Sequence, residues 1–552
     1  MDEQTKTQRE TEIENLVSGL DEQPSAKQKE SKKKAKEEKP KGWFSSLKRS
    51  TKTLIVGFLV LVLLVPAAFL FTKYAPVGES LADESSEEEE VIALFEGPTV
   101  SNISQVTVDN GEVFTIKLDS VTPATDDDEA KRNYKVLELE DLPQDRFAAG
   151  GAIDFVASLS AKQLVVEAPT EEDFEKYGFT NPVITVVVTA DIAKADETRI
   201  PKDFTVKYGI KAATGTEIYV TSDSKEGIYI ASYDAFFTYG KEYYINRTLI
   251  PSYLDDGETQ ISAKSFTVSR PGQEDITVES YDGATLENYV YTPVYRLTSP
   301  FVYNALEERA TGLFSKLSGF SADSVTKAFP SASDKAGYGI SNPSARLNVV
   351  CDNGKTYKIL VGKTHVITTE YLEDDGNSVI YDAEYTYIML DGIDCVYEIL
   401  TDSLEFGELT VDEFLYGLIF LPVMDNLKTL DINGKDAQWH TSFEGESEGI
   451  KINLNGKVVN SENFRTFFQL VVGANCTGSG YGEKETGELL LTINGVFKNG
   501  ETFNYEFYDF GGKNVLVKRS GEAIVISGRN YVDKVFAQIK NAYANVPVDA
   551  VL

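Results

Sequence analysis

Residues 170–188 read TEEDFEKYGFTNPVITVVV, and residues 331–349 read SASDKAGYGISNPSARLNV. Each stretch opens with Thr or Ser, has an Asp three positions later, reaches Tyr-Gly and then Asn-Pro, and continues as a strand-like run. The opening predicts a short helical turn with a capping box, and the glycine can end that turn in the left-handed conformation. Because proline disfavours helical geometry in the preceding residue, Asn-Pro favours the start of a strand. This repeated unit decides the predicted fold.

A third, degraded copy is predicted at residues 481–493, YGEKETGELLLTI, which keep the Tyr-Gly and the strand but lose Asn-Pro. Each copy continues into a strand that ends in a glycine turn, at FTVKYGIK (204–211), YKILVGKT (357–364) and YEFYDFGGK (505–513). The residues that align as a structural motif are Tyr177, Gly178, Asn181, Pro182, Gly209, Tyr338, Gly339, Asn342, Pro343, Gly362, Tyr481, Gly482 and Gly512. Such self-similarity is typical of duplicated modules.

Elements on either side of the motif recur in the same order. A β-hairpin and a helix are expected upstream of each copy, and a second hairpin followed by a helix is expected downstream. The sequence therefore predicts an α+β fold of three tandem modules, each a hairpin, a helix, an antiparallel sheet and a closing helix. We expect these modules at residues 98–250, 258–410 and 425–545, which agrees with a prior of about 150 residues for each domain.

The LVGKT at 360–364 raises the separate question of a phosphate-binding loop. Such a loop needs a glycine five residues before its Gly-Lys, so that backbone N–H groups can surround the phosphates. Tyr357 stands at that position, and Gly362 is instead one of the three aligned turn glycines. We therefore expect a structural turn here, and neither a nucleotide nor another cofactor.

Residues 53–72, TLIVGFLVLVLLVPAAFLFT, form an uncharged run about long enough to cross roughly 30 Å of hydrocarbon as a helix. The residues before this run are rich in Lys and Arg, and those after it are acidic, which places the N-terminus in the cytoplasm. We expect a basic and largely disordered cytoplasmic tail at 1–52, a single transmembrane helix at 53–72, and an acidic linker at 73–97. A cleaved signal peptide is the alternative, although the leader and the apolar core are both long for one.

The chain carries a formal net charge of −34, which repels nucleic acid, so no nucleic-acid partner is expected. A plain solvated acidic surface is one interpretation of this charge, and recruitment of cations or of a basic partner is the other. The three cysteines, Cys351, Cys395 and Cys476, are too few for a disulfide framework. We expect buried thiols, with a Cys351–Cys395 pair left open as the alternative.

No catalytic constellation stands out from the sequence. The two histidines, His365 and His440, fall in different modules, and no His/Cys/Asp cluster has zinc-ligand spacing. Ser324–Lys327 fits a Ser-x-x-Lys pattern but lacks the partner motifs of penicillin-binding enzymes. The acidic loops 126–128 and 374–377 lack the alternating ligands and distal Glu of a calcium loop, although calcium binding stays open. The sequence therefore predicts no catalytic, cofactor-binding or metal-binding residues, and no enzyme.

The 29 tyrosines and 30 phenylalanines suit strand packing, with a carbohydrate- or peptide-binding groove as the alternative interpretation. The order of hairpin, helix, Tyr-Gly-x-x-Asn-Pro, strand, glycine turn, hairpin and helix resembles the domain-of-unknown-function 4340 family over most of residues 98–545. This resemblance implies a bacterial, membrane-anchored, extracytoplasmic protein that is often associated with ABC-type export components. It brings no catalytic residues with it.

We therefore expect an accessory or binding protein of an ABC-type envelope transport system. It would sit in the cell membrane as a single-pass protein with its N-terminus in the cytoplasm and its ectodomain outside. Permease and ATPase subunits, or another envelope protein, would be its partners. The alternative is a cell-envelope scaffold or adhesion protein that binds wall polymer or another surface protein, and an extracellular hydrolase comes third.

Overall fold

Long antiparallel strands make up most of the chain from Ile92 onward. The computed structural model describes residues 92–124, 130–194, 198–232, 238–254, 257–372, 378–445 and 449–552. The expected cytoplasmic tail, the expected membrane span at 53–72 and most of the acidic linker lie outside these residues. Within them, no helix is long and apolar enough to cross a membrane.

The first sheet has eight strands in the order β4-β3-β2-β7-β8-β9-β10-β6. These strands are β2 (Ile103–Asp109), β3 (Val113–Thr122), β4 (Lys131–Val136), β6 (Gln163–Val166), β7 (Ile184–Ala193), β8 (Arg199–Lys211), β9 (Glu217–Ser222) and β10 (Ile228–Ser232). The helices beside it are η2 (Leu137–Leu139), α3 (Arg146–Ala157), α4 (Glu171–Lys176) and η4 (Lys241–Tyr244). A separate two-stranded sheet pairs β1 (Ile92–Ala93) with β5 (Ser160–Ala161).

The second sheet has nine strands in the order β14-β13-β12-β11-β16-β17-β18-β19-β15. These strands are β11 (Ala263–Ser269), β12 (Ile276–Ser280), β13 (Tyr295–Ser299), β14 (Tyr303–Asn304), β15 (Ser324–Ala328), β16 (Ala345–Cys351), β17 (Thr356–Leu372), β18 (Ser378–Leu390) and β19 (Cys395–Leu400). The helices here are α5 (Glu307–Leu317), α6 (Ala332–Gly337), η5 (Thr401–Ser403), η6 (Glu405–Gly407), η7 (Val411–Phe414) and η8 (Met424–Asn426).

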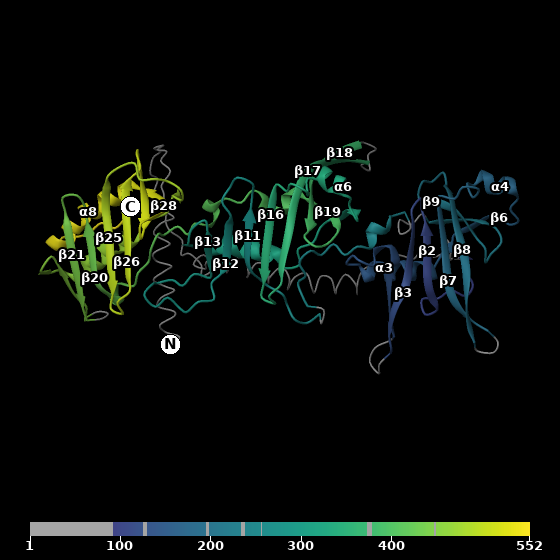
Figure 1. Cartoon of the computed structure of the whole chain (residues 1–552), viewed down its shortest axis with the longest axis horizontal. Helices are drawn as coiled ribbons and strands as arrows, with labels where there is room; N and C mark the ends of the chain where they lie inside the picture. Colours follow the sequence, from purple (N-terminus) through teal and green to yellow (C-terminus); the bar gives the residue numbers. More distant parts are fainter. Residues whose placement is uncertain are drawn as a thin grey trace, which may run out of the picture. The chain divides into compact units, whose positions relative to one another are not determined.

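The third sheet has nine strands in the order β23-β22-β21-β20-β25-β26-β27-β28-β24. These strands are β20 (Leu427–Asn433), β21 (Gln438–Glu444), β22 (Lys451–Leu454), β23 (Lys457–Val458), β24 (Gly478–Ser479), β25 (Leu489–Phe497), β26 (Thr502–Asp509), β27 (Asn514–Arg519) and β28 (Glu522–Gly528). The helices here are α7 (Ser461–Val472) and α8 (Arg529–Ala544). The first, second and third modules below are residues 98–250, 258–410 and 425–545, and each contains one of these sheets (Figure 1).

The three sheets share a strand order and also a β-bulge. In each sheet a central strand, β2, β11 or β20, pairs with β3, β12 or β21 on one side and with β7, β16 or β25 on the other. The register of the second pairing shifts at the same place, directly after Ile103, Ala263 and Leu427. Because bulges are retained within families of related structures, a bulge at matching positions indicates three copies of one module.

The α+β fold class predicted from the sequence is wrong. The described chain is mostly β-sheet, with 44% strand against 19% helix. In the second module the sheet is followed by the short 3-10 turns η5 and η6 instead of the expected closing α-helix. In the first module, residues 233–237, which directly follow β10, lie outside the described residues. The spacing of the apolar residues after β19 explains the missing helix. Leu404, Phe406 and Leu409 are all buried, but residues at this spacing do not lie on one face of an α-helix.

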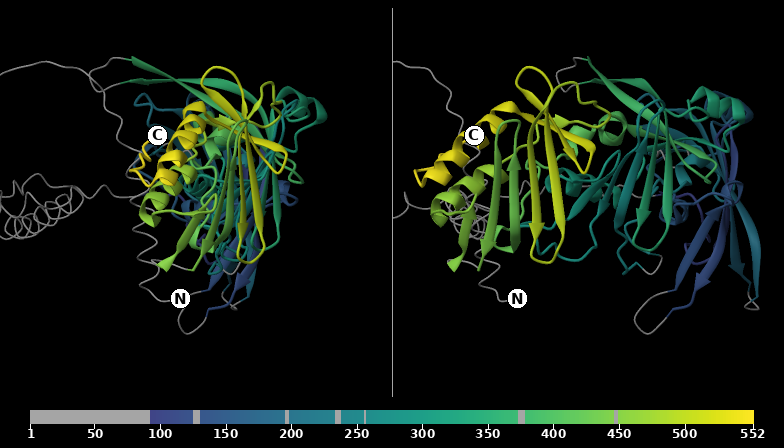
Figure 2. Two further views of the ribbon diagram at one scale, coloured as in Figure 1. Left: turned by 90° about the vertical axis from the view of Figure 1, so that its left-hand side faces the viewer. Right: turned by 60° about the vertical axis from the view of Figure 1, so that its left-hand side comes forward.

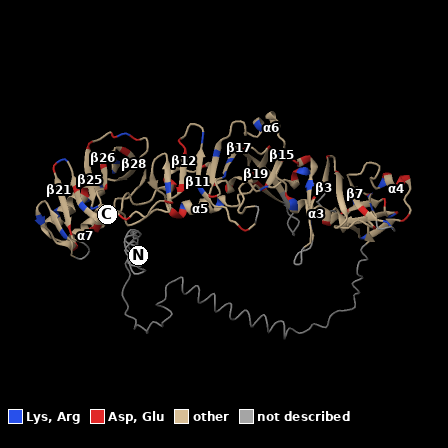
Figure 3. Cartoon of the chain, turned by 60° about the horizontal axis from the view of Figure 1, so that its bottom comes forward, with Lys and Arg blue, Asp and Glu red and all other residues tan. Residues whose placement is uncertain are grey.

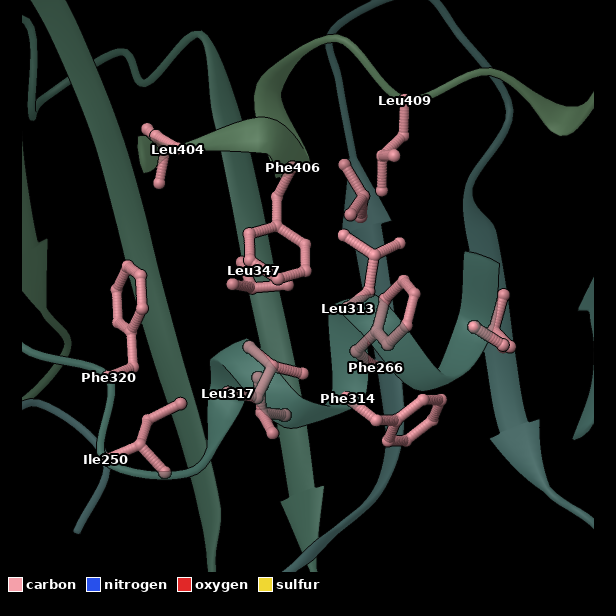
Figure 4. Packing of buried hydrophobic residues seen from close by; sticks show 14 of the residues in the cluster. Ile250, Phe266, Leu313, Phe314, Leu317, Phe320, Leu347, Leu404, Phe406 and Leu409 are labelled. Carbon is pink, nitrogen blue, oxygen red and sulfur yellow. The ribbon is translucent and has the colours of Figure 1, made fainter. Parts of the chain in front are cut away.

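Helix α5 packs on the sheet of the second module (Figure 4). Leu313 and Phe314 of this helix lie near Phe266 of β11 and Leu347 of β16, and all four side chains are buried. The ring of Phe266 lies 5.3 Å from that of Phe314 and 5.7 Å from that of Phe406, measured between centroids. Burying side chains of this size contributes roughly 1.5–3 kcal/mol each, so this cluster positions the turns η5 and η6 that follow β19.

The connecting segment 411–426 is bonded to the modules on both sides of it. It forms β-bridges with Tyr289 and Ala305 of the second module and with Asn475 of the third. The segment therefore belongs to the folded structure of both modules and joins the second module to the third.

Candidate functional site

The structure brings the two halves of the repeated motif together in the first module. The Tyr177 carbonyl oxygen accepts a hydrogen bond from the Ile210 N–H at 3.0 Å. Gly178 has a φ of +85°, which is the left-handed conformation expected after helix α4. A Cβ on Gly209 would lie 2.0 Å from the Tyr177 carbonyl oxygen, so only glycine lets strand β8 pass this close.

The second module repeats this geometry. The Lys363 N–H donates to the Tyr338 carbonyl oxygen at 2.9 Å, and Gly339 has a φ of +80°. A Cβ on Gly362 would lie 2.3 Å from the same carbonyl oxygen. The Lys363 Nζ donates to the Gly337 carbonyl at 3.0 Å. Both the backbone and the side chain of the Gly-Lys-Thr lysine thus contact the helical turn beside them.

The motif tyrosines make one further contact that is the same in both modules. The ring centroid of Tyr177 lies 4.6 Å from that of Tyr219 on β9, and the ring centroid of Tyr338 lies 4.6 Å from that of Tyr387 on β18. The sequence does not single out the two strand tyrosines, because tyrosine is common in strands. Matched packing of this kind marks the motif as a structural unit of the module.

The Asn-Pro pairs occupy the turn between the short helix and the next strand. Strands β7 and β16 begin two residues after Pro182 and Pro343. The side chains of Asn181 and Asn342 are exposed. The pairs therefore set the direction of the chain, as the sequence predicts.

The alignment of Gly512 with the other turn glycines needs correction. The sheet register matches Gly209 and Gly362 with Tyr508 on β26. Gly512 lies in the turn after β26, with a φ of +60° and nothing within 4 Å of an added Cβ. In the third module the Asp509 N–H donates to the Glu488 carbonyl at 2.9 Å, because strand β25 continues where the other modules have the helical turn. No motif tyrosine packs there, so no glycine is needed.

Tyr481 and Gly482, the Tyr-Gly of the third copy, do not make the contacts that the other two copies make. The ring of Tyr481 stacks on that of Phe301 in the second module, with centroids 5.8 Å apart and planes at 15°. Gly482 follows in a turn with a φ of +76°. This part of the degraded copy therefore belongs to the junction between two modules.

A cleft of about 670 Å³ opens in the second module beside Gly362, and we call it the acidic cleft. Its walls come from α5, β17, β18, the turns η5 to η7 and Ser344, which directly precedes β16. The charged residues that line it are Arg309, Glu384, Asp402, Glu405, Glu408 and Glu413. Acidic residues occur on all three sheets (Figure 3), so what distinguishes this place is that five carboxylates share one hollow with one guanidinium. Low-dielectric walls strengthen the negative potential of such a hollow.

Arg309 ties two of these carboxylates together. Its Nη1 donates to Glu405 Oε2 at 2.7 Å, and its Nε and Nη2 donate to Glu413 Oε2 at 3.1 and 2.8 Å. The ammonium group of Lys316 also pairs with Glu405. The positive charges of Arg309 and Lys316 are therefore paired with Glu405 and Glu413, and these pairs connect helix α5 to the turns η6 and η7.

Glu413 also closes a capping box at the start of η7. Burial raises the pKa of its carboxyl, but hydrogen bonds from Thr410 and Arg309 outweigh burial and hold the pKa below its usual value. The Thr410 N–H donates to Glu413 Oε1 at 2.8 Å. Glu413 is therefore ionised at neutral pH and has a structural role.

The other three carboxylates of the cleft have no such partner. Glu384, Asp402 and Glu408 make no ion pair with any residue that the structure describes. No group of three or more His, Cys, Asp or Glu side chains in the described ranges is arranged to hold a metal ion. The cleft is therefore suited to receive separate positive groups along its length.

Strands β17 and β18 continue beyond the sheet as a two-stranded ribbon, residues 364–372 and 378–386, which we call the arm (Figure 2). Strand β17 pairs with β16 only as far as Val361, and β18 pairs with β19 only from Tyr385 onward. Within the described chain, the two strands of the arm otherwise pair only with each other. Among the described residues, the outer edges of these strands beyond the sheet pair with no further strand, and extended peptides can add to such edges as strands.

The two faces of the arm differ in chemistry, because successive strand residues alternate between faces. The face that continues the acidic cleft carries Thr364, Val366, Thr368, Asp382, Glu384 and Thr386. The opposite face carries His365, Ile367, Thr369, Tyr381, Ala383 and Tyr385. The first face therefore carries two carboxylates together with the exposed apolar side chains of Val366 and Ile380, and the other face is mainly apolar and aromatic. The first and third sheets lack this extension, since β9 and β27 have six residues each against 13 in β18.

The remaining candidates from the sequence do not assemble a catalytic site. His365 stacks on Tyr387 at 4.3 Å, and its Nε2 lies 3.3 Å from Glu398 Oε1. The Ser324 hydroxyl donates to Glu398 Oε2 at 3.0 Å. The serine therefore bonds to the carboxylate and not to the imidazole. His440 lies in the third module, with its Nδ1 2.6 Å from Asp431 Oδ1.

The three cysteines are free thiols in the described structure. Cys351 and Cys395 are buried, and burial raises the pKa of the Cys395 thiol to about 12. The alternative of a disulfide between them is not what the structure has. The acidic loops 126–128 and 374–377 lie outside the described residues.

No family model, curated protein or solved structure matches this chain. The resemblance to the domain-of-unknown-function 4340 family therefore stays a prediction.

Proposed function

We propose that this protein is a membrane-anchored extracytoplasmic binding protein that holds a partner protein through the acidic cleft and the arm. The observation that supports this most directly is that the unpaired carboxylates of the cleft continue onto one face of a ribbon with free strand edges. A cleft of about 670 Å³ also falls within the range of roughly 300–1,000 Å³ that is usual for binding sites.

The side chains of the arm alternate between its two faces, and this alternation indicates what sequence a partner segment should have. A strand added to either edge would place alternate side chains on the face with the carboxylates and on the mainly apolar face. The matching partner segment is therefore extended and alternates Lys or Arg with apolar residues. Its basic side chains would meet Glu384 and Asp402, and its apolar side chains would lie beside Ile367 and Tyr381, which are 37% and 56% exposed.

This proposal fits the accessory role in an ABC-type envelope transport system that the sequence suggests, because such a subunit must hold other proteins. It also fits the alternative of an envelope scaffold that binds another surface protein. Co-purification of the detergent-solubilised protein with a permease and an ATPase favours the first over the second.

A defined peptide tests the chemistry directly. Full-length protein in detergent micelles is titrated against a fluorescent ten-residue peptide that alternates lysine and valine, and binding is followed by anisotropy. We expect Glu384→Lys/Asp402→Lys to weaken binding at least tenfold and added salt to weaken it further. The matched control is Glu274→Lys/Asp275→Lys, which makes the same charge change on an exposed turn of the same module and should stay within twofold of wild type.

A crosslinking experiment in native membranes tests the location. A photo-reactive amino acid at Val366 on the arm should capture a partner peptide with the alternating basic pattern, while one at Val113 of the first module should not. Both positions are well exposed, at 58% and 57%. Equal loss of peptide binding in both charge-reversal variants, or capture from Val113 alone, would contradict the proposal.

A further inference from the structure

A second cleft, of about 250 Å³, lies where the second and third modules meet, and we call it the junction cleft. Its walls come from β13, β14, β26, the turn after β27 and the connecting segment 411–426. Arg296 and Arg519 line it, and none of the described residues that line it is acidic. In a chain with 87 acidic against 53 basic residues, a hollow lined by two guanidiniums favours an anionic group, and the carboxylate beside it, that of Glu307, is engaged by the Tyr291 hydroxyl, which donates to Glu307 Oε2 at 3.2 Å.

Aromatic rings form much of the remaining surface. Tyr291 and Tyr416 stack with centroids 5.5 Å apart and planes at 10°, and Phe420 and Tyr505 stack at 4.6 Å and 19°. Rings of tyrosine offer a flat apolar face together with a hydroxyl group. A sugar ring has the complementary chemistry, because its C–H groups can lie on such faces while its hydroxyl groups need hydrogen-bonding partners. Side-chain amides at the cleft come from Asn304 and Asn504.

The two arginines have different roles. The Arg519 Nη2 donates to the Val302 carbonyl at 2.5 Å, so this side chain joins the third module to the second. The guanidinium carbon of Arg296 lies 4.0 Å from the ring centroid of Tyr281, and this side chain makes no ion pair with any residue in the described ranges. A guanidinium stacked in this way keeps its N–H groups available in its own plane, where they can hold a carboxylate or phosphate in two places.

We infer that the junction cleft binds one sugar unit that carries a carboxylate or phosphate group, such as a unit of an acidic polysaccharide. The volume limits the ligand, because about 250 Å³ is smaller than the sites that hold drug-sized molecules and leaves room for a single ring. Tyr291 and Tyr416 supply the stacking surface, and Arg296 holds the anionic group. This site is separate from the acidic cleft and takes a ligand of opposite charge, so the two proposals fail independently.

Saturation-transfer NMR on the full-length protein in lipid nanodiscs tests this inference. The probes are glucuronate, glucose 6-phosphate, glucose and inorganic phosphate. We expect at least one anionic sugar to bind at least tenfold more tightly than glucose and inorganic phosphate, and the better of the two identifies the anion. Arg296→Gln should weaken its binding at least tenfold, while Arg346→Gln, at an exposed position of the same module, should stay within twofold.

Several results would overturn the inference. If neither anionic sugar binds, or if glucose binds as tightly as they do, the arginines do not select the ligand. If inorganic phosphate alone binds as tightly as glucose 6-phosphate, the cleft is a plain anion site. If Arg296→Gln unfolds at the same temperature as wild type and keeps full affinity, the binding lies elsewhere.

Discussion

Replacing Gly362 with alanine should favour local unfolding of the second module and leave the first module unchanged. The added carbon would lie 2.3 Å from the Tyr338 carbonyl oxygen and 3.1 Å from that of Tyr387, so the turn or the strand must move by about 1 Å. Overpacking of this kind costs roughly 1–3 kcal/mol, and loss of the Lys363–Tyr338 hydrogen bond costs about 1 kcal/mol more. The sum of about 2–4 kcal/mol corresponds to a roughly 30- to 700-fold rise in the opening equilibrium.

Hydrogen exchange of the full-length protein, followed by mass spectrometry, measures this change module by module. Amides of β16 and β17 should exchange faster in Gly362→Ala, and those of β7 and β8 in the first module should not change. The matched control is Gly312→Ala on α5, where nothing lies within 4 Å of the added carbon and alanine favours the helix by about 1 kcal/mol. Exchange of β16 and β17 within twofold of wild type in Gly362→Ala would refute the steric account of the motif.

Three further outcomes follow from the same structure. Gly209→Ala should lower the unfolding free energy by about 2–4 kcal/mol, and Gly512→Ala by only about 1–2 kcal/mol, because the second meets no neighbour and strains only its own backbone; denaturant titration compares them. The pKa of Glu413 is held below its usual value of 4.5, so its contribution to stability is complete above that pH and is lost as the pH falls through the lowered pKa. The difference in unfolding midpoint between wild type and Glu413→Gln should therefore be largest near neutral pH and shrink toward pH 3. All three thiols should react slowly with iodoacetamide at pH 8 in the folded protein and quickly in denaturant, because burial raises their pKa values and limits access; mass spectrometry reads the label.

Local signals in the sequence predicted local structure well. Thr170 with Asp173, and Ser331 with Asp334, form the capping boxes expected of them, and the prediction is confirmed by hydrogen bonds in both directions. The residues involved are three positions apart, so the sequence alone contains the whole interaction. The left-handed glycines that follow are confirmed for the same reason.

Long-range features could not be read in this way. The sequence aligns Gly512 wrongly for two reasons. The third copy has no helical turn to fix the register, and Gly511-Gly512 lies close in sequence to Tyr508, which is the true match. The acidic cleft combines residues 309, 384, 402 and 413, which lie far apart in the chain and meet only after the sheet has formed. The expected closing helix of the second module did not form because the burial of single apolar residues outweighed local helix preference, whereas that of the third module is present as α8.

The bridges of segment 411–426 also have a mechanical consequence. A force applied at the C-terminus would pass from the third module to segment 411–426 through the bridge to Asn475, and from that segment to the second module through the bridges to Ala305 and Tyr289. No flexible linker would have to extend first. Tension would then load these bridges before either sheet unravels, and a sugar held in the junction cleft would resist their separation. Ligand binding at the junction cleft and the mechanical strength of the junction would thus depend on the same few contacts.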